Sequence, residues 1–486
     1  MTDSVLIPYK YDSFGRKAIY TGYTTVDESN VIEVLKKAIP TYESNAKDCK
    51  RLYNYYKGEQ PILARTKSVR PEINNTIVVN RAYEIVTFKT GRFLYKDIQY
   101  VNRRESKNTD EVNRLNGFMH YEGKEGKDRS LADWFHICGH GYRMIIDAKM
   151  AEGVPFHVYT IDPQRAFVVY SDTVEQEPVL GAYYTLNADG QKIYTVYTKN
   201  QVFTVMNYEI IGEPKNHILG AVPIIEYKNN NARLGCFEVV LGLLDALNLA
   251  ESDRLDGLEN FIQALLVFKG LDIDDEGVQA LKAEGAICIP PDTDLTYLVH
   301  ELNQTQTQSL VDDLYQAVLT ICGMPNRNGG SSTSDNKGAV VLRDGWSAAA
   351  TAVKETRQYF EEAERRMLKI ALKCFNTYMD ADEPGIDHNL TISDIDIHFD
   401  EGEYENTLEK AQVLTMLLGN DWVHPRQAYE LSNIAPDPES AYNQGKAFHE
   451  EQERKEQEEL DRQIAKEVER AKASVNDAET DNNDNV

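Results

Sequence analysis

The chain has 486 residues, 42% of them hydrophobic and 9% aromatic, which predicts a folded protein with several structural units rather than a disordered one. Its 78 acidic and 52 basic residues give a formal net charge of −26, which argues against a protein that grips nucleic acid tightly, because Lys and Arg supply most non-specific affinity. That charge is compatible with a protein past which DNA slides. The six cysteines form no C-x-x-C pair and no apolar segment opens the chain, so we expect a reducing compartment and no secretion.

The first 235 residues are predicted to form an arm followed by an α+β unit. The arm is 1–27, rich in tyrosine and turns, and the unit is 28–235. Helical spacing of apolar residues predicts helices at 31–57 (interrupted at Pro40), 80–94, 110–120 and 131–140, with a charged loop at 122–127. Alternation predicts antiparallel strands at 142–147, 156–161, 166–170, 179–186, 192–198, 201–206 and 224–227.

A stretch without Pro at 237–268 is the first of two long predicted helices. Its apolar residues recur at helical spacing: Val240, Leu244, Leu247, Leu258, Phe261 and Leu265. The chain then enters an insert with a short helix at 276–283 and strands at 286–289 and 295–299. It returns as a helix at 306–321, whose apolar stripe is Leu310, Leu314, Ala317, Val318 and Ile321. This order predicts an antiparallel helical stalk with a small tip.

The second long helix is predicted at 339–375. Its apolar residues again lie three or four positions apart or at multiples of that spacing: Leu342, Trp346, Ala349, Val353, Phe360, Met367, Ile370 and Cys374. The two helices would be roughly 48 and 55 Å long, which is long for the core of a compact domain. Acidic residues interrupt both and exclude a membrane span. We therefore expect their apolar flanks to pack against neighbouring copies of the chain.

The two long helical regions are separated by a breaker-rich loop at 323–338, whose length predicts a functional or disordered segment. After the second long helix, alternation predicts a strand at 390–399, followed by helices at 405–418 and 425–431. Residues 451–486 carry twelve acids against six bases. They predict an exposed acidic helix to 473 and a disordered tail at 474–486.

Two motifs suggest chemistry but are interpreted as structural. In the His136-Ile-Cys138-Gly-His140 sequence the histidines could share a helix face, but Cys138 would point elsewhere and no Glu follows His136 as in H-E-x-x-H. Gly329-Gly330-Ser331-Ser332, followed by Lys337, lacks the P-loop spacing and follows a helix rather than a strand. We expect neither a metal site nor a nucleotide site here.

Two groups of acids are interpreted in the same way. Four side chains have the composition of a calcium loop: Asp394, Asp396, His398 and Glu405. The position that needs Gly for the turn holds Phe399, so we expect an exposed acidic strand. Four acids of the first long helix could be taken for a metal-dependent nuclease centre: Asp245, Asp253, Asp256 and Glu259. We expect them to lie on a solvated face instead, and we expect no cofactor and no enzyme.

Four parts of the sequence carry a further signal when they are read in chain order. They are YYKGEQPI with NRAYEIVTFKTGRFLYKD, then FHVYTIDPQRAFVVYSDTVEQEPVLGAYYT, then HILGAVPIIEYKNNNARLGCFEVVLGLLDALNLAESDRLDGLENF, and finally GMPNRNGGSSTSDNKGAVVLRDGW. In that order they resemble the N-terminal helices, the wing sheet, the stem entry and the tunnel loop of tailed-bacteriophage portal proteins, the head-to-tail connectors. The resemblance covers residues 28–445 and departs at SDNKG, where the family has a more Ser-Gly-like join.

The resemblance implies a predominantly helical α+β portal fold that assembles as a ring of about twelve subunits around a central channel. The implied parts are an N-terminal arm (1–27), a wing (28–235 with the strand 390–400), stem helices (236–268 and 305–322), a clip (269–304), a tunnel loop (323–338), a long tunnel and wing helix (339–380), a helical crown (404–473) and a disordered acidic tail (474–486).

The implied function is a channel at one capsid vertex. A separate terminase motor packages double-stranded DNA through it, and the DNA is later ejected the same way. The implied partners are further copies of the chain, the terminase large subunit, the major capsid and scaffold proteins, and a head-completion or tail adaptor protein, with no membrane. The resemblance also implies a role in nucleating procapsid assembly, and a place in the virion after assembly in the host cytoplasm.

The resemblance also assigns candidate residues by position. Four would contact DNA weakly and without sequence preference at the tunnel loop: Arg327, Asn328, Lys337 and Arg343. Six would pack the stem and its neighbours: Leu244, Leu247, Leu258, Phe261, Leu314 and Val318. Four would pack the long helix: Leu342, Trp346, Val353 and Phe360. Acidic charge along the channel would repel phosphates, so that the DNA slides.

Two other classes stay open at this point. Another virion structural protein, such as a capsid or tail adaptor, would be expected to lack the order of helix, insert, helix, loop and helix found here. A metal-dependent nuclease would need a compact group of carboxylates, whereas the acids of this sequence are spread over long helices.

Overall fold

The computed structural model describes residues 14–103, 109–262, 265–269, 294–298, 304–326, 345–383, 389–399, 407–432, 434–435 and 438–483. The chain divides into two compact units. One consists of residues 1–95 and 117–392, and the other of residues 96–116 and 393–486. Segments far apart in the sequence therefore complete each unit.

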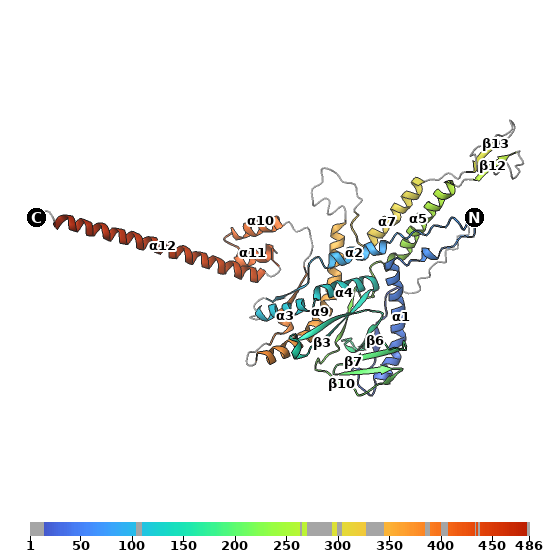
Figure 1. The fold of residues 1–486 in the computed structure, drawn as a ribbon, viewed down its shortest axis with the longest axis horizontal. Coiled ribbons are helices and arrows are strands. Elements are labelled where there is room, and N and C mark those ends of the chain that lie inside the picture. The colour runs from blue at the N-terminus through green and yellow to red at the C-terminus, as the bar shows by residue number, and fades with distance from the viewer. Residues whose placement is uncertain are drawn as a thin grey trace. The chain divides into compact units, whose positions relative to one another are not determined.

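The larger sheet of the first unit has the strand order β1-β5-β6-β7-β8-β10, with β9 paired to β8 (Figure 1). Its strands are β1 (Ile19–Thr21), β5 (Ala166–Ser171), β6 (Pro178–Leu186), β7 (Lys192–Tyr197), β8 (Gln201–Met206), β9 (Glu209–Ile210) and β10 (Lys215–Asn216). Neighbouring strands are antiparallel except β1, which is parallel to β5. The predicted strands of this sheet are confirmed, and β1 lies within the segment predicted to be an arm.

Helix α1 (Val31–Lys57) packs its first half on this sheet. Tyr42 stacks on Phe167 of β5 with ring centroids 4.6 Å apart. The predicted interruption at Pro40 is wrong, because the helix runs through that residue. An interior Pro costs about 3 kcal/mol, and burial of the neighbouring Ala38 and Ile39 against the sheet offsets that cost. Gly58, at φ 101°, ends the helix.

The smaller sheet has the order β11-β3-β4 and consists of β3 (His140–Asp147), β4 (Phe156–Ile161) and β11 (Ile224–Lys228). Helices α4 (Lys124–Cys138) and α9 (Trp346–Asp382) both pack against it. The segment 122–127 was predicted to be a loop, but most of it is the first turn of α4. Lys124 and Asp128 lie one turn apart and form a buried 2.7 Å ion pair, so this run of charges stabilises a helix.

A second core joins the end of α1 to α2 (Arg81–Phe93), α4, α5 (Leu241–Ile262) and α7 (Gln304–Ile321). The side chain of Asn80 caps α2 by accepting a hydrogen bond from the Tyr83 N–H. Short 3-10 turns at Pro61–Ala64 and Glu238–Val240 precede α2 and α5, and another, Met150–Glu152, lies between β3 and β4. Helix α2 confirms its prediction, as does α3 (Thr109–Tyr121), which runs from the second unit into the first.

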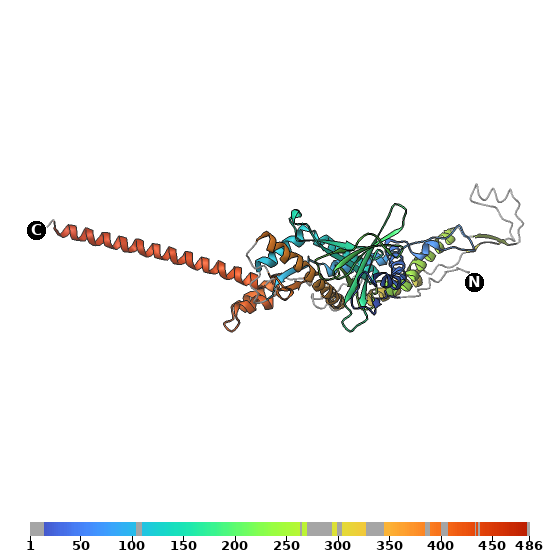
Figure 2. The same ribbon diagram turned by 90° about the horizontal axis from the view of Figure 1, so that it is seen from below.

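Helices α5 and α7 lie side by side, and the β-hairpin of β12 (Leu265–Lys269) and β13 (Asp294–Leu298) follows at their far end (Figures 1 and 2). The first long helix was predicted to reach 268 but ends at Ile262. The apolar run Leu265–Phe268 suits an extended strand at least as well as a helix, and its pairing with β13 decides between them. Strand β13 confirms one insert strand, while the predicted elements at 276–283 and 286–289 lie outside the described residues.

Helix α9 buries its apolar stripe within the first unit. Ala349, Met367 and Cys374 are all buried, and the helix packs against β11, β3 and α2. We expected this flank to need neighbouring copies, but the smaller sheet and α2 of the same chain cover it. Leu342, and the start of the predicted helix at 339, lie outside the described residues.

In the second unit, β2 (Gln99–Asn102) pairs antiparallel with β14 (Ile395–His398). Strand β2 was not predicted, and only four residues of the predicted strand 390–399 are extended, because a 3-10 turn occupies Ile392–Asp394. Helices α10 (Thr407–Leu418), α11 (Pro425–Ser432) and α12 (Pro438–Asn483) complete the unit. Helix α12 continues past 473, where a disordered tail was expected; three alanines between 471 and 478 favour the helix. Among the residues that the structure describes, no helix is both long and apolar enough to cross a membrane.

Candidate functional site

The paired helices α5 and α7 are built onto the core of the first unit. Leu244 and Leu247 of α5 are buried in one cluster with Val318 and Leu319 of α7 and with Ile85 of α2. Tyr315 of α7 donates a hydrogen bond to Glu84 of α2 over 2.9 Å. The near end of the helix pair is therefore fixed by apolar packing and by polar contacts to α2.

A polar ladder along α5, formed by Asn248, Ser252 and Asp256, holds the extended segment 75–79. Each ladder side chain accepts one backbone N–H: from Val79 to Asn248 (2.8 Å), from Ile77 to Ser252 (2.9 Å) and from Asn75 to Asp256 (2.8 Å). The spacings match, because four helical residues rise about 6 Å and two extended residues rise about 6.6 Å. All three ladder residues are buried.

Asp256 at the end of the ladder is also an ionic centre. It pairs with Arg65 at 3.1 Å and with Lys67, and it accepts the side-chain amide of Asn75 at 2.9 Å. Burial alone would raise the pKa of this carboxyl, but the hydrogen bonds from Lys67 and Asn75 outweigh it and hold the pKa below its ordinary value. The expected solvated face is thus wrong for Asp256, because cations from the 65–75 segment cover it.

The other acids of that group have separate partners. Asp245 accepts the hydroxyl of Tyr55 at 2.8 Å, and the more exposed Asp253 pairs with Arg65. Glu259 is partly buried. In the part of the chain that the structure describes, no three His, Cys, Asp or Glu side chains are grouped so that they could hold a metal ion. A carboxylate neutralised by Arg and Lys is also a poor ligand for a second cation.

The two ends of the segment 327–344 meet at one place in the first unit. A Cβ added to Gly345 would lie 3.9 Å from Met324 O and Pro325 Cα. Gly323 and Gly345 both have positive φ angles, 58° and 80°, which allow the chain to leave α7 and to enter α9 abruptly. Met324 and Pro325, within the predicted tunnel loop, therefore lie close to Gly345, and the later loop residues 327–338 lie outside the described residues.

Aromatic and basic side chains surround this loop base. The ring centroids of Trp346 and Phe88 lie 6.2 Å apart. The Arg92 guanidinium lies 5.8 Å from the centroid of the Trp346 ring. Lys89 Nζ would lie 3.8 Å from a Cβ at Gly323. We did not predict Lys89 and Arg92 as site residues. Their spacing of three on a predicted helix indicates a shared face, but nothing in the sequence places that face beside the loop.

The predicted tunnel-loop residues Arg327, Asn328, Lys337 and Arg343 lie outside the described residues. Of the predicted stem-packing residues, Leu244, Leu247 and Val318 are buried in the chain's own core, so a neighbouring copy would have to contact other residues. Leu314 is partly buried, Leu258 is exposed, and Phe261 lies in α5. Of the long-helix residues, Val353 and Phe360 are buried and Trp346 is partly buried.

Several apolar side chains on the helix pair and its base remain exposed. They are Val239, Leu258, Leu310 and Ile321. Two lie on α5 or the turn before it, and two lie on α7. Exposed single apolar residues are ordinary, but four on one helix pair mark a surface that another protein can cover.

The His136, Cys138 and His140 motif, which we predicted to be structural, lies inside the first unit. All three residues are buried, and Thr90 Oγ1 lies 3.0 Å from His136 Nδ1. Burial lowers the pKa of His136 to about 3 and that of His140 to about 4, so both imidazoles are neutral at physiological pH. They occupy the end of α4 and the start of β3, where the helix gives way to the sheet.

A buried ion cluster, absent from the predictions, joins four elements of the first unit. Lys124 pairs with Glu364 at 2.8 Å, and Arg143 pairs with Glu364 at 3.2 Å and with Asp128. The Tyr227 hydroxyl donates to Glu364 at 2.6 Å. Two acids and two bases cancel, so the cluster can stay ionised away from water. It ties α9 to α4, β3 and β11.

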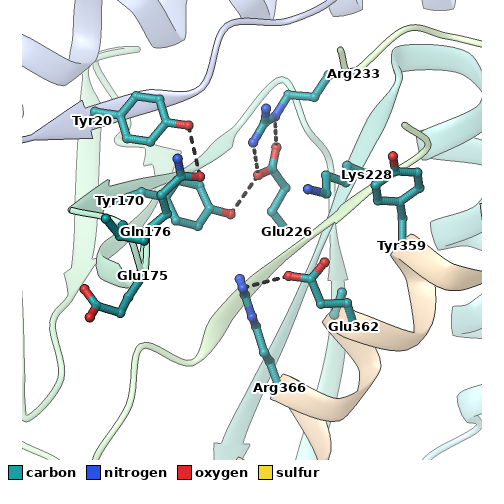
Figure 3. A pocket seen from close by; sticks show the side chains of 12 residues that line it. Tyr20, Tyr170, Glu175, Gln176, Glu226, Lys228, Arg233, Tyr359, Glu362 and Arg366 are labelled. Atoms are coloured by element: carbon teal, nitrogen blue, oxygen red, sulfur yellow. Dashed lines mark hydrogen bonds and ion pairs between the residues drawn. The ribbon is translucent and has the colours of Figure 1, made fainter. Parts of the chain in front are cut away.

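A pocket of about 150 Å³ lies between β1, β5, β11 and α9 (Figure 3). At its floor, Arg233 binds the Glu226 carboxylate through two bonds of 2.6 and 2.8 Å, and the Tyr170 hydroxyl donates to it at 2.7 Å. Burial would raise the pKa of Glu226, but Arg233 lowers it to about 2. Such a carboxylate is a poor general base near neutral pH.

The described residues thus contain a pair of packed helices, two chain segments that lie close together at 324–325 and Gly345, and buried charged groups that pair with one another. A model of the family "Phage portal protein, SPP1 Gp6-like" matches residues 35–469, nearly the whole chain. The chain belongs to this family of portal proteins.

Among solved structures, the chain is similar to subunits of gene transfer agent (GTA) particles. One, from the neck of an empty GTA particle computed with C6 symmetry, is 13% identical, with a TM-score of 0.41 over 73% of this chain and 90% of that one. Another, from the virion of a native GTA particle, is 12% identical, with a TM-score of 0.41 over 80% of this chain and 94% of that one. No curated protein sequence matches the chain.

Proposed function

We propose that the chain is a portal subunit that assembles with copies of itself into a ring at one capsid vertex. Double-stranded DNA is packaged through the channel of this ring and later ejected through it. The observation that supports this most is the family match over 35–469, which spans the α5–α7 pair and both ends of the 327–344 segment. The proposal includes the absence of catalysis by this chain, with a separate terminase motor supplying the ATPase.

The ring proposal rests on the surface of the helix pair. Val239, Leu258, Leu310 and Ile321 are exposed there, while Leu244, Leu247 and Val318 of the same pair are buried in the chain's own core. A neighbouring copy could cover these residues through a heterologous contact. Such contacts close into a ring when the rotation from one copy to the next is a whole fraction of a full turn. About twelve copies would carry on the order of −300 formal charges, which disfavours tight DNA binding in the channel.

Contact with DNA is proposed at the loop between α7 and α9. The proposal is that the ring turns this region toward the channel, so that Arg327, Lys337 and Arg343 can contact the DNA together with Lys89 and Arg92, which lie near Gly323 and Trp346. A few cations on an acidic wall would give weak, sequence-independent contacts with phosphates. The proposed partners are the capsid and scaffold proteins, the terminase large subunit and a head-completion or tail adaptor protein. The proposal places the chain in the host cytoplasm during assembly, where it nucleates the procapsid, and at the vertex of the finished virion.

Particle mass combined with negative-stain class averages of the purified full chain tests the ring. The expected result is annular particles of about twelve times 55.2 kDa with a central hole. A monomer at low concentration should convert to rings at high concentration or with the scaffold protein. A persistent monomer or dimer without a channel would contradict the proposal and favour another virion structural protein.

Substitution of the loop bases tests the DNA contact separately. Lys337→Ala combined with Arg327→Ala should alter DNA packaging or retention and leave ring assembly intact, because both residues fall between α7 and α9 in the sequence and neither belongs to those helices. Lys369→Ala, a single charge removed from α9 away from the loop end, is the control. Loss of rings in the loop variant would show that this segment is an assembly element instead.

A further inference from the structure

The imidazole of His157, near the start of β4, lies between two carboxylates that come from separate turns. Its Nδ1 lies 3.1 Å from Oε1 of Glu122, which follows α3. Its Nε2 lies 2.6 Å from Oε2 of Glu152, in the turn between β3 and β4. All three residues belong to the first unit. One ring therefore joins the turn before α4 to the turn before β4.

These two contacts need both ring nitrogens to donate a hydrogen bond. An ionised carboxylate can only accept hydrogen bonds, and a neutral imidazole has one N–H donor and one lone pair. In the neutral form, one nitrogen would therefore turn its lone pair toward a carboxylate oxygen. Since only the imidazolium satisfies Glu122 and Glu152 together, this arrangement is specific to protonated His157.

The rest of the chain holds the two carboxylates unequally. The Glu122 side chain is only 9% exposed, and its Oε2 also accepts the Val158 N–H at 3.0 Å and Lys127 Nζ at 3.2 Å. The Glu152 side chain is 42% exposed and makes no second hydrogen bond or ion pair with any residue that the structure describes. Loss of one proton from His157 should therefore leave the contact with Glu122 in place and release Glu152.

The same contacts make the ring easier to protonate. Burial by itself would lower the pKa of His157, but the hydrogen bonds to Glu122 and Glu152 outweigh burial and raise the pKa above its ordinary value of 6.5. Because the folded-state pKa is raised, the stability that these contacts contribute is fully present below pH 6.5. It is lost as the pH rises through the folded-state pKa.

Other titratable groups near His157 have contacts of their own. Lys127 of α4 bonds the Glu122 oxygen that the imidazole does not contact, and the Tyr159 ring centroid lies 6.2 Å from that of His157. Further titratable side chains on the surrounding turns and on β3 are Asp147, Lys149, His120 and Glu125, of which the last two pair with each other at 2.8 Å. Among charged groups, Glu122 and Glu152 act most strongly on the ring.

We propose that His157 is a proton-operated clasp, which orders the β3–β4 turn at residues 148–155 when its ring is protonated and releases that turn when the ring is neutral. In the protonated state the imidazolium ties Glu152 to Glu122. In the neutral state the remaining N–H stays with Glu122, and Glu152 moves with its turn into solvent. The clasp acts within one chain, so it does not depend on the proposed ring.

Exchange of the imidazole Cε1 hydrogen for deuterium, measured by mass spectrometry of peptides from the full chain, gives the protonation midpoint of His157. The midpoint should lie above pH 6.5. Glu152→Gln, which replaces the carboxylate by a neutral amide at an exposed position, should lower the midpoint. A midpoint at or below 6.5, or one that Glu152→Gln leaves unchanged, would overturn the clasp.

Backbone amide exchange tests whether this proton orders the turn. The turn is closed by hydrogen bonds from the N–H groups of Glu152 and Gly153, 2.8 and 3.2 Å long. After correction for intrinsic exchange rates, the amides of 148–155 should exchange several-fold faster above the midpoint than below it. His157→Asn cannot carry the charge, so its turn should exchange fast at both pH values. Equal exchange on both sides of the midpoint in the unmodified chain would refute the switch.

His217→Gln is the matched control for both measurements. His217 is partly buried in the same unit, but its Nε2 contacts the Thr198 carbonyl oxygen at 3.0 Å. The variant should keep the midpoint of His157 and the pH dependence of the turn. Loss of that dependence in His217→Gln would show that the turn responds to another histidine and would contradict the assignment to His157.

Discussion

Helices α9 and α12 carry apolar residues at similar spacing, yet the two stripes have different surroundings. In α9, Val353, Phe360 and Ile370 are buried against the sheet and helices of the same chain. In α12, Leu460 and Ile464 are half exposed and no described residue covers them. Periodicity therefore identifies a face that needs a partner, but the tertiary structure decides whether that partner is the chain itself.

Charged residues differ between the two helices in the same way. Glu364 of α9 is fully buried and held by Lys124, Arg143 and Tyr227. The acids of α12 from 450 to 461 are exposed, and the ion pairs described for them lie within one helical turn. Buried charges are costly to leave unpaired, whereas exposed pairs contribute little, so substitutions in the two helices should have very different effects on stability.

The largest expected effect is that of Glu364→Ala. It leaves Lys124 and Arg143 buried with only Asp128 to neutralise them, and breaking such a network costs about 3–5 kcal/mol. Urea unfolding followed by tyrosine fluorescence should show this loss. Glu362→Ala, which removes an exposed ion pair with Arg366 on the same helix, should cost at most about 1 kcal/mol. Equal losses would contradict the contrast between buried and exposed charges.

The next effect concerns the polar ladder of α5. Asp256→Asn replaces a carboxylate that Arg65 and Lys67 both contact, and loss of charged hydrogen bonds costs about 1.5–3 kcal/mol. Hydrogen exchange should increase at the amides of Asn75 and Ile77, which the ladder binds. Asp253→Asn, which removes a more exposed charge from the same helix, is the control and should leave that exchange nearly unchanged.

A smaller effect should follow from pH. His136 and His140 have folded-state pKa values of about 3 and about 4, so the folded chain does not take up the protons that the unfolded chain binds below pH 6.5. Stability should therefore fall as the pH drops, by about 1 kcal/mol per histidine between pH 6.5 and 5.5.

The variant His140→Gln isolates one of these contributions. Its unfolding free energy should change less with pH than that of the unmodified chain over the same interval, by about 1 kcal/mol. Identical pH dependence in the two proteins would show that His140 becomes protonated without unfolding. His120→Gln, at an exposed histidine, controls for the substitution itself.

The sequence predicted much of the helix and strand order because periodicity and turn residues are local signals. It missed β2 and extended the first long helix too far, since the pairings of β2 with β14 and of β12 with β13 decide those segments. The buried cluster around Glu364 and the cover over Asp256 were not foreseeable. Asp256 and its partner Lys67 lie 189 residues apart along the chain. Glu364 and Arg143 lie 221 residues apart, and their cluster draws on four separate elements. Charge alone predicted solvation for Asp256.

The smallest expected effect is that of Ile464→Ser in α12. The substitution removes an apolar side chain that is already half exposed, so the unfolding free energy measured on the dilute full chain should change by less than about 0.5 kcal/mol. Ile370→Ala in α9, where the same residue type is buried, should cost about 2–5 kcal/mol in the same measurement.

The comparison becomes sharper when both variants are measured in dilute protein. Ile464→Ser should keep the unfolding curve of the unmodified chain, whereas Ile370→Ala should shift it toward lower denaturant concentration. A large loss of stability in dilute protein would mean that α12 packs on its own chain, and the two helices would then differ only in which part of the fold covers them. An unchanged unfolding curve for Ile464→Ser assigns the α9 stripe, but not the α12 stripe, to folding.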